Sequence, residues 1–202
     1  MLLVLSALTG ALFGWLMGSV PPSLTSGTFW IGNLAAPWAL FAFGAGWAQR
    51  SRLWAALGGV ATEVAIVAGF YLSALVDPVV DPWAHFGLPY PGLLTRLGTG
   101  LSDWLSCISP WAIPAIAAGV VYGMLGRWWG RSRPIAAGIA LAVPFFVEPV
   151  WWRAFEGYPL EGSLVVWVVE IAVGIALVGW ALVERRRYSA DDSAPVRQAG
   201  AG

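Results

Sequence analysis

Charge is scarce in this chain. Only 11% of its 202 residues are charged and 58% are hydrophobic, whereas a soluble domain is about one quarter charged. A water-exposed surface needs charge, and a lipid-facing surface excludes it because an ion in hydrocarbon costs several kcal/mol. The composition therefore excludes an ordinary soluble domain and predicts a protein of the lipid bilayer. The formal net charge of zero gives no basis for binding nucleic acid.

Cysteine and histidine are equally scarce. Cys107 has no second cysteine with which to form an intrachain disulfide, and we interpret it as a small packing residue. One cysteine and one histidine, His85, do not supply the three or four ligands that zinc takes. The sequence therefore predicts no metal site and no bound cofactor.

Motifs of common catalytic and nucleotide-binding sites are also missing. The chain contains no Gly-x-Ser-x-Gly elbow, no His-Glu-x-x-His pair and no glycine-rich phosphate loop. We therefore predict that the protein is not an enzyme. An intramembrane hydrolase built from Glu63 and Glu170 is a third alternative that no motif supports.

Long apolar runs fill most of the chain. About 20 apolar residues cross the hydrocarbon core as a helix, and such runs are expected at 1–20, 28–48, 53–76, 104–126, 134–152 and 163–183. We therefore predict an all-α fold, a polytopic transmembrane bundle of about six helices over residues 1–183. The polar tail at 184–202 is expected to be disordered.

Two segments, 1–20 and 77–103, need separate interpretation, the first as a possible signal peptide and the second as a possible loop. Residues 1–20 lack a basic leading segment and a small-residue cleavage site, so we expect a retained helix and not a cleavable signal peptide. The segment 77–103 has a turn-forming composition with four prolines, Pro78, Pro82, Pro89 and Pro91. We expect it to form an outer loop that, with Asp77, Asp81 and His85, acts as a lid.

Arginine indicates the orientation. The chain has no lysine, and all 11 basic residues are arginines. If the N-terminus is cytoplasmic, the cytoplasmic segments hold nine of these 11: Arg50, Arg52, Arg127, Arg131, Arg133, Arg185, Arg186, Arg187 and Arg197. Because basic residues concentrate in cytoplasmic loops, we predict a plasma-membrane protein with both termini in the cytoplasm.

Small residues repeat every three or four positions in several expected spans. In the first span the stripe comprises Ala7, Gly10, Ala11 and Gly14. Such stripes let helix backbones approach closely in lipid, where no hydrophobic force drives helices together. Two interpretations are open, namely ordinary contact within the bundle and docking of a partner membrane protein on this face.

Three glutamates fall inside expected spans, and an ionisable group inside a bilayer is a functional hypothesis by default. At about 1.5 Å per residue, Glu148 should lie about 6 Å and Glu170 about 10 Å below the outer ends of their spans. Asn33 should lie at a depth similar to that of Glu148, and Glu63 near the bilayer middle. We predict that Asn33, Glu148 and Glu170 converge on one outward-facing cavity with Glu63 at its floor, a candidate substrate-binding site.

Prolines support a cavity at Glu148. Pro144 and Pro149 each remove a backbone donor, and a broken helix at membrane depth is tolerated where it lines a cavity. No basic residue is expected at these depths to neutralise the carboxyl groups. Three interpretations stay open: protonation, which burial favours, binding of a cationic or amine-bearing solute, and structural hydrogen bonds to neighbouring helices.

Several short motifs carry a resemblance: Gly10-Ala-Leu-Phe-Gly14, the Asn-x-x-x-Pro-Trp run from Asn33 to Trp38, and Glu148-Pro149. Over residues 5–183 the chain resembles a family of small membrane proteins from high-GC Gram-positive bacteria, a domain of unknown function. This resemblance implies a membrane location and no activity. In architecture the chain is similar to the substrate-binding S components of energy-coupling-factor vitamin transporters, which implies an outward-facing site and a docking first helix.

These observations lead to two functional hypotheses. The first is a membrane protein that binds or transports a small solute from the outer face, with the help of a partner. The alternative is a non-transporting scaffold or regulatory protein that acts through helix contacts. A polar outer cavity favours the first, and a solid core with paired carboxyl groups favours the second.

Overall fold

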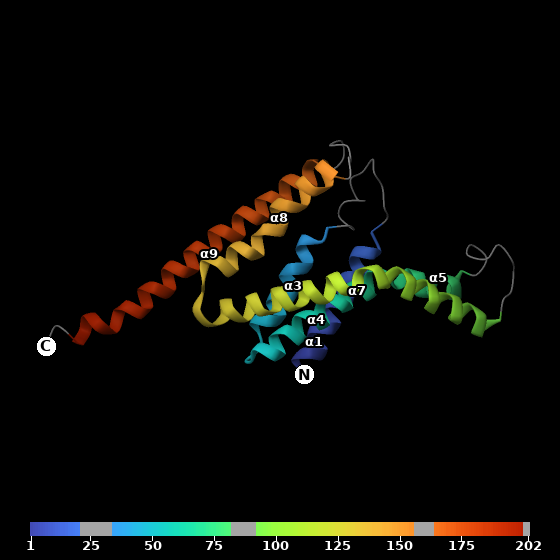
Figure 1. The fold of residues 1–202 in the computed structure, drawn as a ribbon, viewed down its shortest axis with the longest axis horizontal. Coiled ribbons are helices and arrows are strands. Elements are labelled where there is room, and N and C mark those ends of the chain that lie inside the picture. Colours follow the sequence, from blue (N-terminus) through green and yellow to red (C-terminus); the bar gives the residue numbers. More distant parts are fainter. Residues whose placement is uncertain (21–33, 82–91, 156–163, 200–202) are drawn as a thin grey trace.

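The computed structural model describes residues 1–20, 34–81, 92–155 and 164–199, and every regular element within these ranges is an α-helix. The predicted all-α fold is therefore confirmed. Figure 1 shows the helices in chain order: α1 (Leu2–Gly18), α3 (Ala36–Trp47), α4 (Arg52–Phe70), α5 (Leu72–Val80), α7 (Leu93–Ser132), α8 (Ile135–Phe155) and α9 (Leu164–Ala199).

Three stretches of described helix are long and apolar enough to cross a membrane: Arg52–Val80, Leu93–Ser132 and Leu164–Ser189. Two shorter helices, Leu2–Gly18 and Ile135–Trp151, are also apolar. The 12 residues of α3 extend over about 18 Å, which is less than the roughly 30 Å of a hydrocarbon core. The six-span topology and the cytoplasmic termini therefore stay predictions.

Large apolar side chains cover the outside of the helices. Leu8 is 62% exposed on α1, Ile113 79% on α7 and Val165 74% on α9, and many other aliphatic residues share this property. Soluble monomers rarely expose apolar surface on this scale, and lipid chains are as apolar as leucine. The surface of the protein is thus suited to a bilayer.

Helix α1 packs directly on α4 through its glycines. A Cβ atom added to Gly14 would lie 2.0 Å from the carbonyl oxygen of Ile66, and one added to Gly10 would lie 2.5 Å from that of Thr62. The bundle interpretation of the first-span stripe therefore holds. Helix α4 of the same chain covers the two glycines, and docking of a partner on the Ala7, Gly10, Ala11 and Gly14 face stays a prediction.

The same kind of contact joins α7 to α3 and α4. Added Cβ atoms on Gly59 of α4 and Gly46 of α3 would each lie 2.0 Å from a carbonyl oxygen of α7, that of Gly119 and that of Gly123 respectively. Close backbone packing is the main source of helix association in lipid. Helix α7, which runs across the picture from yellow to green in Figure 1, therefore holds the centre of the bundle together.

The prediction of an outer loop at 77–103 is wrong where the structure describes this segment. Helix α5 continues to Val80 and α7 already begins at Leu93, so the described parts form a helical hairpin that extends to the right in Figure 1. The middle of the expected lid, residues 82–91 with His85, lies outside the described residues.

Contacts between α5 and α7 explain why the described parts of this segment are helical, although their composition predicts a loop. Gly100 has no side chain, so the Leu75 carbonyl oxygen approaches to 2.4 Å from where its Cβ would be. Arg96 Nη1 donates to the carbonyl oxygen of Val79 at 3.0 Å, close to the C-terminus of α5, where a cation is favourable. Pro78 lies inside α5 and costs one backbone hydrogen bond, which these tertiary contacts offset.

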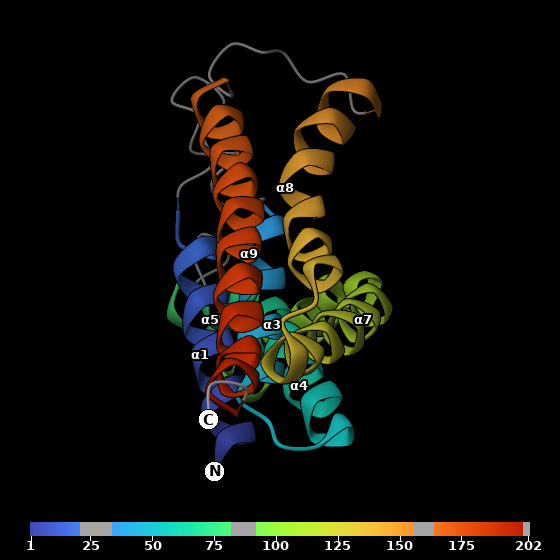
Figure 2. The same cartoon turned by 90° about the vertical axis from the view of Figure 1, so that its left-hand side faces the viewer.

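Helix α8 runs without interruption through Pro144 and Pro149, so the expected broken helix is wrong. Each proline removes one backbone donor, but transmembrane helices tolerate proline because the freed backbone groups find partners in neighbouring elements. Figure 2 shows α8 beside α9, at an angle to α7. Gly138 of α8 faces Ala181 of α9 at this contact.

Helix α9 continues to Ala199, whereas its polar composition from residue 184 predicts disorder. Two interactions anchor the beginning of this extension. Arg185 Nη1 donates to the carbonyl oxygen of Ser132 at 3.3 Å, and Arg187 Nη1 lies 3.3 Å from Glu184 Oε1 one turn earlier. Pairs at this spacing support a helix locally.

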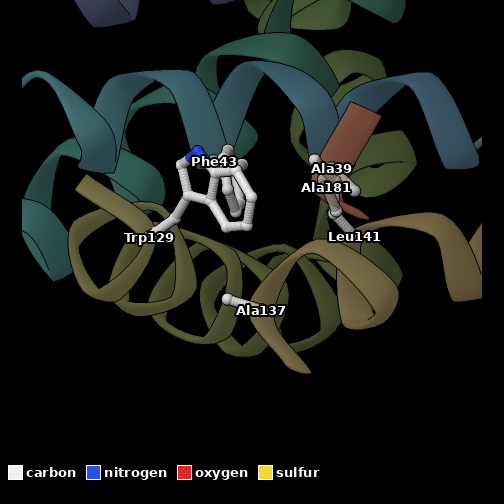
Figure 3. Close-up of a cluster of buried hydrophobic side chains, with 6 residues drawn as sticks. All are labelled: Ala39, Phe43, Trp129, Ala137, Leu141 and Ala181. Carbon is white, nitrogen blue, oxygen red and sulfur yellow. The ribbon is translucent and has the colours of Figure 1, made fainter. Parts of the chain in front are cut away.

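A cluster of buried apolar side chains lies where α7 turns into α8. Figure 3 shows its members: Ala39, Phe43, Trp129, Ala137, Leu141 and Ala181. The ring of Trp180 packs against that of Trp129 in a tilted arrangement, with centroids 4.7 Å apart. The Arg133 guanidinium carbon lies 5.0 Å from the ring centroid of Trp47, a cation–π distance.

Arginines from separate segments meet at this same end of the molecule. Arg127 Nη2 donates to the carbonyl oxygen of Arg50, and Arg185 reaches the end of α7 at Ser132. These are the segments that the sequence assigns to the cytoplasmic side. Their proximity fits one membrane face rich in positive charge.

We predict that reporter enzymes fused after Arg52, after Arg131 and at the C-terminus will read cytoplasmic, and that a fusion near Pro89 will read external. The reason is that basic segments resist translocation across the membrane. Paired alkaline phosphatase and fluorescent-protein fusions in a bacterial host measure this directly. An external reading at Arg131 would contradict the six-span topology.

Candidate functional site

A cavity of about 540 Å³ lies between α3, α4, α7 and α8. Its volume falls within the range of roughly 300–1,000 Å³ that is typical of small-molecule sites. Its walls carry two carboxyl groups, those of Glu63 and Glu148, and six aromatic rings. No basic side chain belongs to the described lining, which comprises Ala35, Ala36, Trp38, Ala39, Glu63, Val67, Phe70, Tyr71, Trp111, Pro114, Ala115, Ala118, Tyr122, Pro144, Val147, Glu148 and Trp151.

Small residues create the space. Ala39 of α3 and Ala115 and Ala118 of α7 contribute only methyl groups to the walls, and Pro114 and Pro144 replace longer side chains. Toward the other ends of α3, α7 and α8, the side chains of Phe43, Trp129 and Leu141 belong to the buried apolar cluster.

Glu148 closes the N-terminus of α3. The residue before this helix is Ala35, which has no side chain to cap it. The Ala35 N–H donates to Glu148 Oε1 at 2.8 Å, and the Ala36 N–H donates to Oε2 at 2.7 Å. A carboxylate at a helix N-terminus meets unpaired donors and the positive end of the helix dipole. Glu148 therefore both lines the cavity and fixes where α3 begins.

Glu170 lies behind Glu148. It is buried, with 3% of its surface exposed, and its carboxyl group is within hydrogen-bonding reach of Glu148. Neither of its oxygens finds a donor among the described residues. Two ionised carboxylates have no proton to share, whereas a protonated Glu170 would donate to Glu148.

Glu63 is the carboxyl group of the cavity that is available to pair with a ligand. It lines the wall from the middle of α4 and is 3% exposed. Among the described residues it has neither a hydrogen bond nor an ion pair, and Tyr122 is close enough for the two groups to interact electrostatically. Burying a polar group without a partner is costly. A ligand that pairs with Glu63 would therefore remove that cost.

The predicted site is assembled in part. Glu63 and Glu148 line one cavity, and Glu170 contacts Glu148 but is not part of the lining. Asn33 lies outside the described residues. The described part of the chain holds no group of three or more His, Cys, Asp and Glu side chains that would bind a metal ion.

Sequence reasoning missed the aromatic wall. Trp111 and Trp151 both line the cavity together with Trp38. The ring of Trp38 lies 6.0 Å from that of Phe70 between centroids, and Phe70 meets the next residue, Tyr71, edge to face at 5.0 Å. One signal was present in the sequence, since Trp151 follows Glu148 by three positions and thus shares its helix face.

Compared with protein-family models, curated proteins and solved structures, the chain matches none. The resemblances drawn from its motifs therefore stay predictions. The chemistry of the cavity is what indicates a function.

Proposed function

We propose that this protein is an integral membrane protein that binds a small solute in the cavity between α3, α4, α7 and α8. The solute would enter the cavity from the outer face of the membrane. The observation that carries the proposal is Glu63, a buried carboxyl group that faces the cavity and has no partner among the described residues. An ionisable residue inside a membrane protein is expensive and usually marks a substrate or ion pathway.

The position of the cavity supports access from outside. Its lining includes the start of α3 and the second half of α8, at Ala35 and Glu148. The arginine contacts involve the opposite ends of these helices, near Trp47 and Arg133. A site on the far side of the bundle from the basic segments faces outward in the predicted orientation.

The scaffold hypothesis has less support. It relied on small-residue stripes as docking surfaces, and the glycines of α1, α3, α4 and α7 that carry these stripes contact backbone of the same chain. The cavity provides the specific observation that the scaffold hypothesis lacks.

We predict that a cysteine in the cavity will react with a water-soluble maleimide added outside. The variant is Ala118→Cys with Cys107→Ser, because Ala118 lines the cavity and Cys107 is the one native cysteine. A thiol reacts as its thiolate, so it needs water around it. Labelling of intact cells or oriented proteoliposomes, read by a mass shift, should modify most of the protein.

Two matched controls define the result. Ala142→Cys lies in the core at 0% exposure, and Ile175→Cys lies on the lipid-facing side of α9 at 61% exposure. Both should stay unlabelled, the first for lack of access and the second for lack of water. If Ala118→Cys is as inert as Ile175→Cys, the cavity holds lipid and the proposed function is wrong.

A further inference from the structure

Resting on the proposed solute site, we propose that its ligand is an organic cation. Its charged nitrogen would lie beside Glu63 and its apolar part among the aromatic rings of the cavity. The inference combines the charge of the lining, the nature of its walls and its size.

The charge of the cavity selects a cation. Glu63 and Glu148 line it, and no described lining residue is basic. The two N–H groups at the start of α3 already bind Glu148, whereas Glu63 has no hydrogen-bond or ion-pair partner among the described residues. Charges attract more strongly in a site with little water than in bulk solvent. An anionic ligand would meet two carboxyl groups with no cation to offset them.

The walls distinguish an organic cation from a metal ion. Calcium takes six to eight oxygen ligands and magnesium six in octahedral geometry, and the lining is mainly aromatic and aliphatic. The faces of Trp, Tyr and Phe rings attract ammonium groups within about 6 Å of the ring centroid. Tyr122 and Glu63 line the same cavity, so an ammonium group bound there would have a carboxylate and an aromatic ring available to it.

The size of the cavity sets the class of molecule. A volume of about 540 Å³ is far larger than a bare ammonium ion requires and suits an amine with an apolar group attached. Trp38 and Phe70, 6.0 Å apart between centroids, offer that group two adjoining ring surfaces. We therefore expect an arylalkyl or alkyl amine or quaternary ammonium compound.

The first test uses charged thiol reagents on Ala118→Cys with Cys107→Ser. The trimethylammonium and sulfonate forms of ethyl methanethiosulfonate differ in charge and little in size, and their rates are normalised to a free thiol. The cationic reagent should react at least about ten-fold faster, because a cavity of one charge concentrates counter-ions. Adding Glu63→Gln should bring the ratio toward one.

The outcomes separate the two proposals. If neither reagent reacts, the proposed outward-open solute site is wrong. If both react at equal rates, or the sulfonate reacts faster, the cavity is open and the organic-cation inference is wrong. The rates on the Ala118→Cys parent alone decide this, so the test stands even where Glu63→Gln does not fold.

The second test uses three probes of similar shape on purified wild-type protein in lipid nanodiscs. They are 2-phenylethylamine, neutral 2-phenylethanol and anionic 3-phenylpropionate, each at millimolar concentration. Only the amine should raise the melting temperature, and Trp111→Leu, which removes a half-exposed ring from the wall, should reduce the shift. Glu184→Gln, on the polar extension of α9, is the matched control and should keep it. Equal shifts with the alcohol or the acid would overturn the inference.

Discussion

Gly14→Leu should leave little folded protein. A Cβ atom at this position would lie 2.0 Å from the carbonyl oxygen of Ile66 and 2.9 Å from its Cα atom. Both atoms belong to the backbone of α4, so no side-chain rotation relieves the clash, and the helices must separate. Overpacking a tight interior commonly costs about 1–3 kcal/mol, and the lost α1–α4 contact adds to this. We expect a sharp loss of monodisperse protein on size exclusion and a large drop in melting temperature.

Gly44→Leu is the matched control. Gly44 lies in α3, with nothing within 4 Å of its Cβ position, so the same exchange adds a side chain to an open surface. Replacing a helical glycine with leucine also gains helix propensity, by up to about 1 kcal/mol. Gly44→Leu should therefore melt at or above the wild-type temperature. If Gly14→Leu behaves in the same way, α1 does not contact α4 as described.

Glu148→Gln should destabilise the protein by about 2–4 kcal/mol, a sum of a hydrogen bond to a charged group and the helix-dipole interaction. The Glu148 carboxylate serves the N–H groups of both Ala35 and Ala36. Glutamine has a single carbonyl oxygen, which accepts from one of these N–H groups. Its NH₂ group is a donor, so the other N–H would face a second donor and have no acceptor. The expected readout is a lower unfolding midpoint in detergent, measured by denaturant titration.

Glu170→Gln should be nearly silent in the same assay, with a change below about 1 kcal/mol. A glutamine amide at this position donates to the Glu148 carboxylate as a protonated carboxyl group would. The two variants change neighbouring groups by the same atom, so they are matched in size and depth. A silent Glu148→Gln together with a damaging Glu170→Gln would show that Glu170 carries the charge and that Glu148 does not cap α3.

The part of the candidate site that shows in hydropathy along single segments was predictable from the sequence. Glu63 stands out in the sequence because a carboxyl group within an apolar span is rare, and the structure places it in the cavity wall. The role of Glu148 was not predictable, since its partners at Ala35 and Ala36 lie 113 and 112 positions away along the chain. The rings of Trp38 and Trp111 were hidden for a similar reason, because tryptophan is common at any membrane interface.

The amino-acid sequence by itself determined the helical class of this protein, its apolar surface and its scarcity of charge, because these follow from composition and from hydropathy along single segments. It also determined which segments carry arginine. Only the tertiary structure decided that the chain stays helical through Pro78, in α5, and through Pro144, in α8. Turn signals act within a few residues, whereas the contacts that overrule them come from other helices. The same holds for the glycines: spacing shows that two backbones are able to meet, and the fold decides that Gly14 meets Ile66 of its own chain.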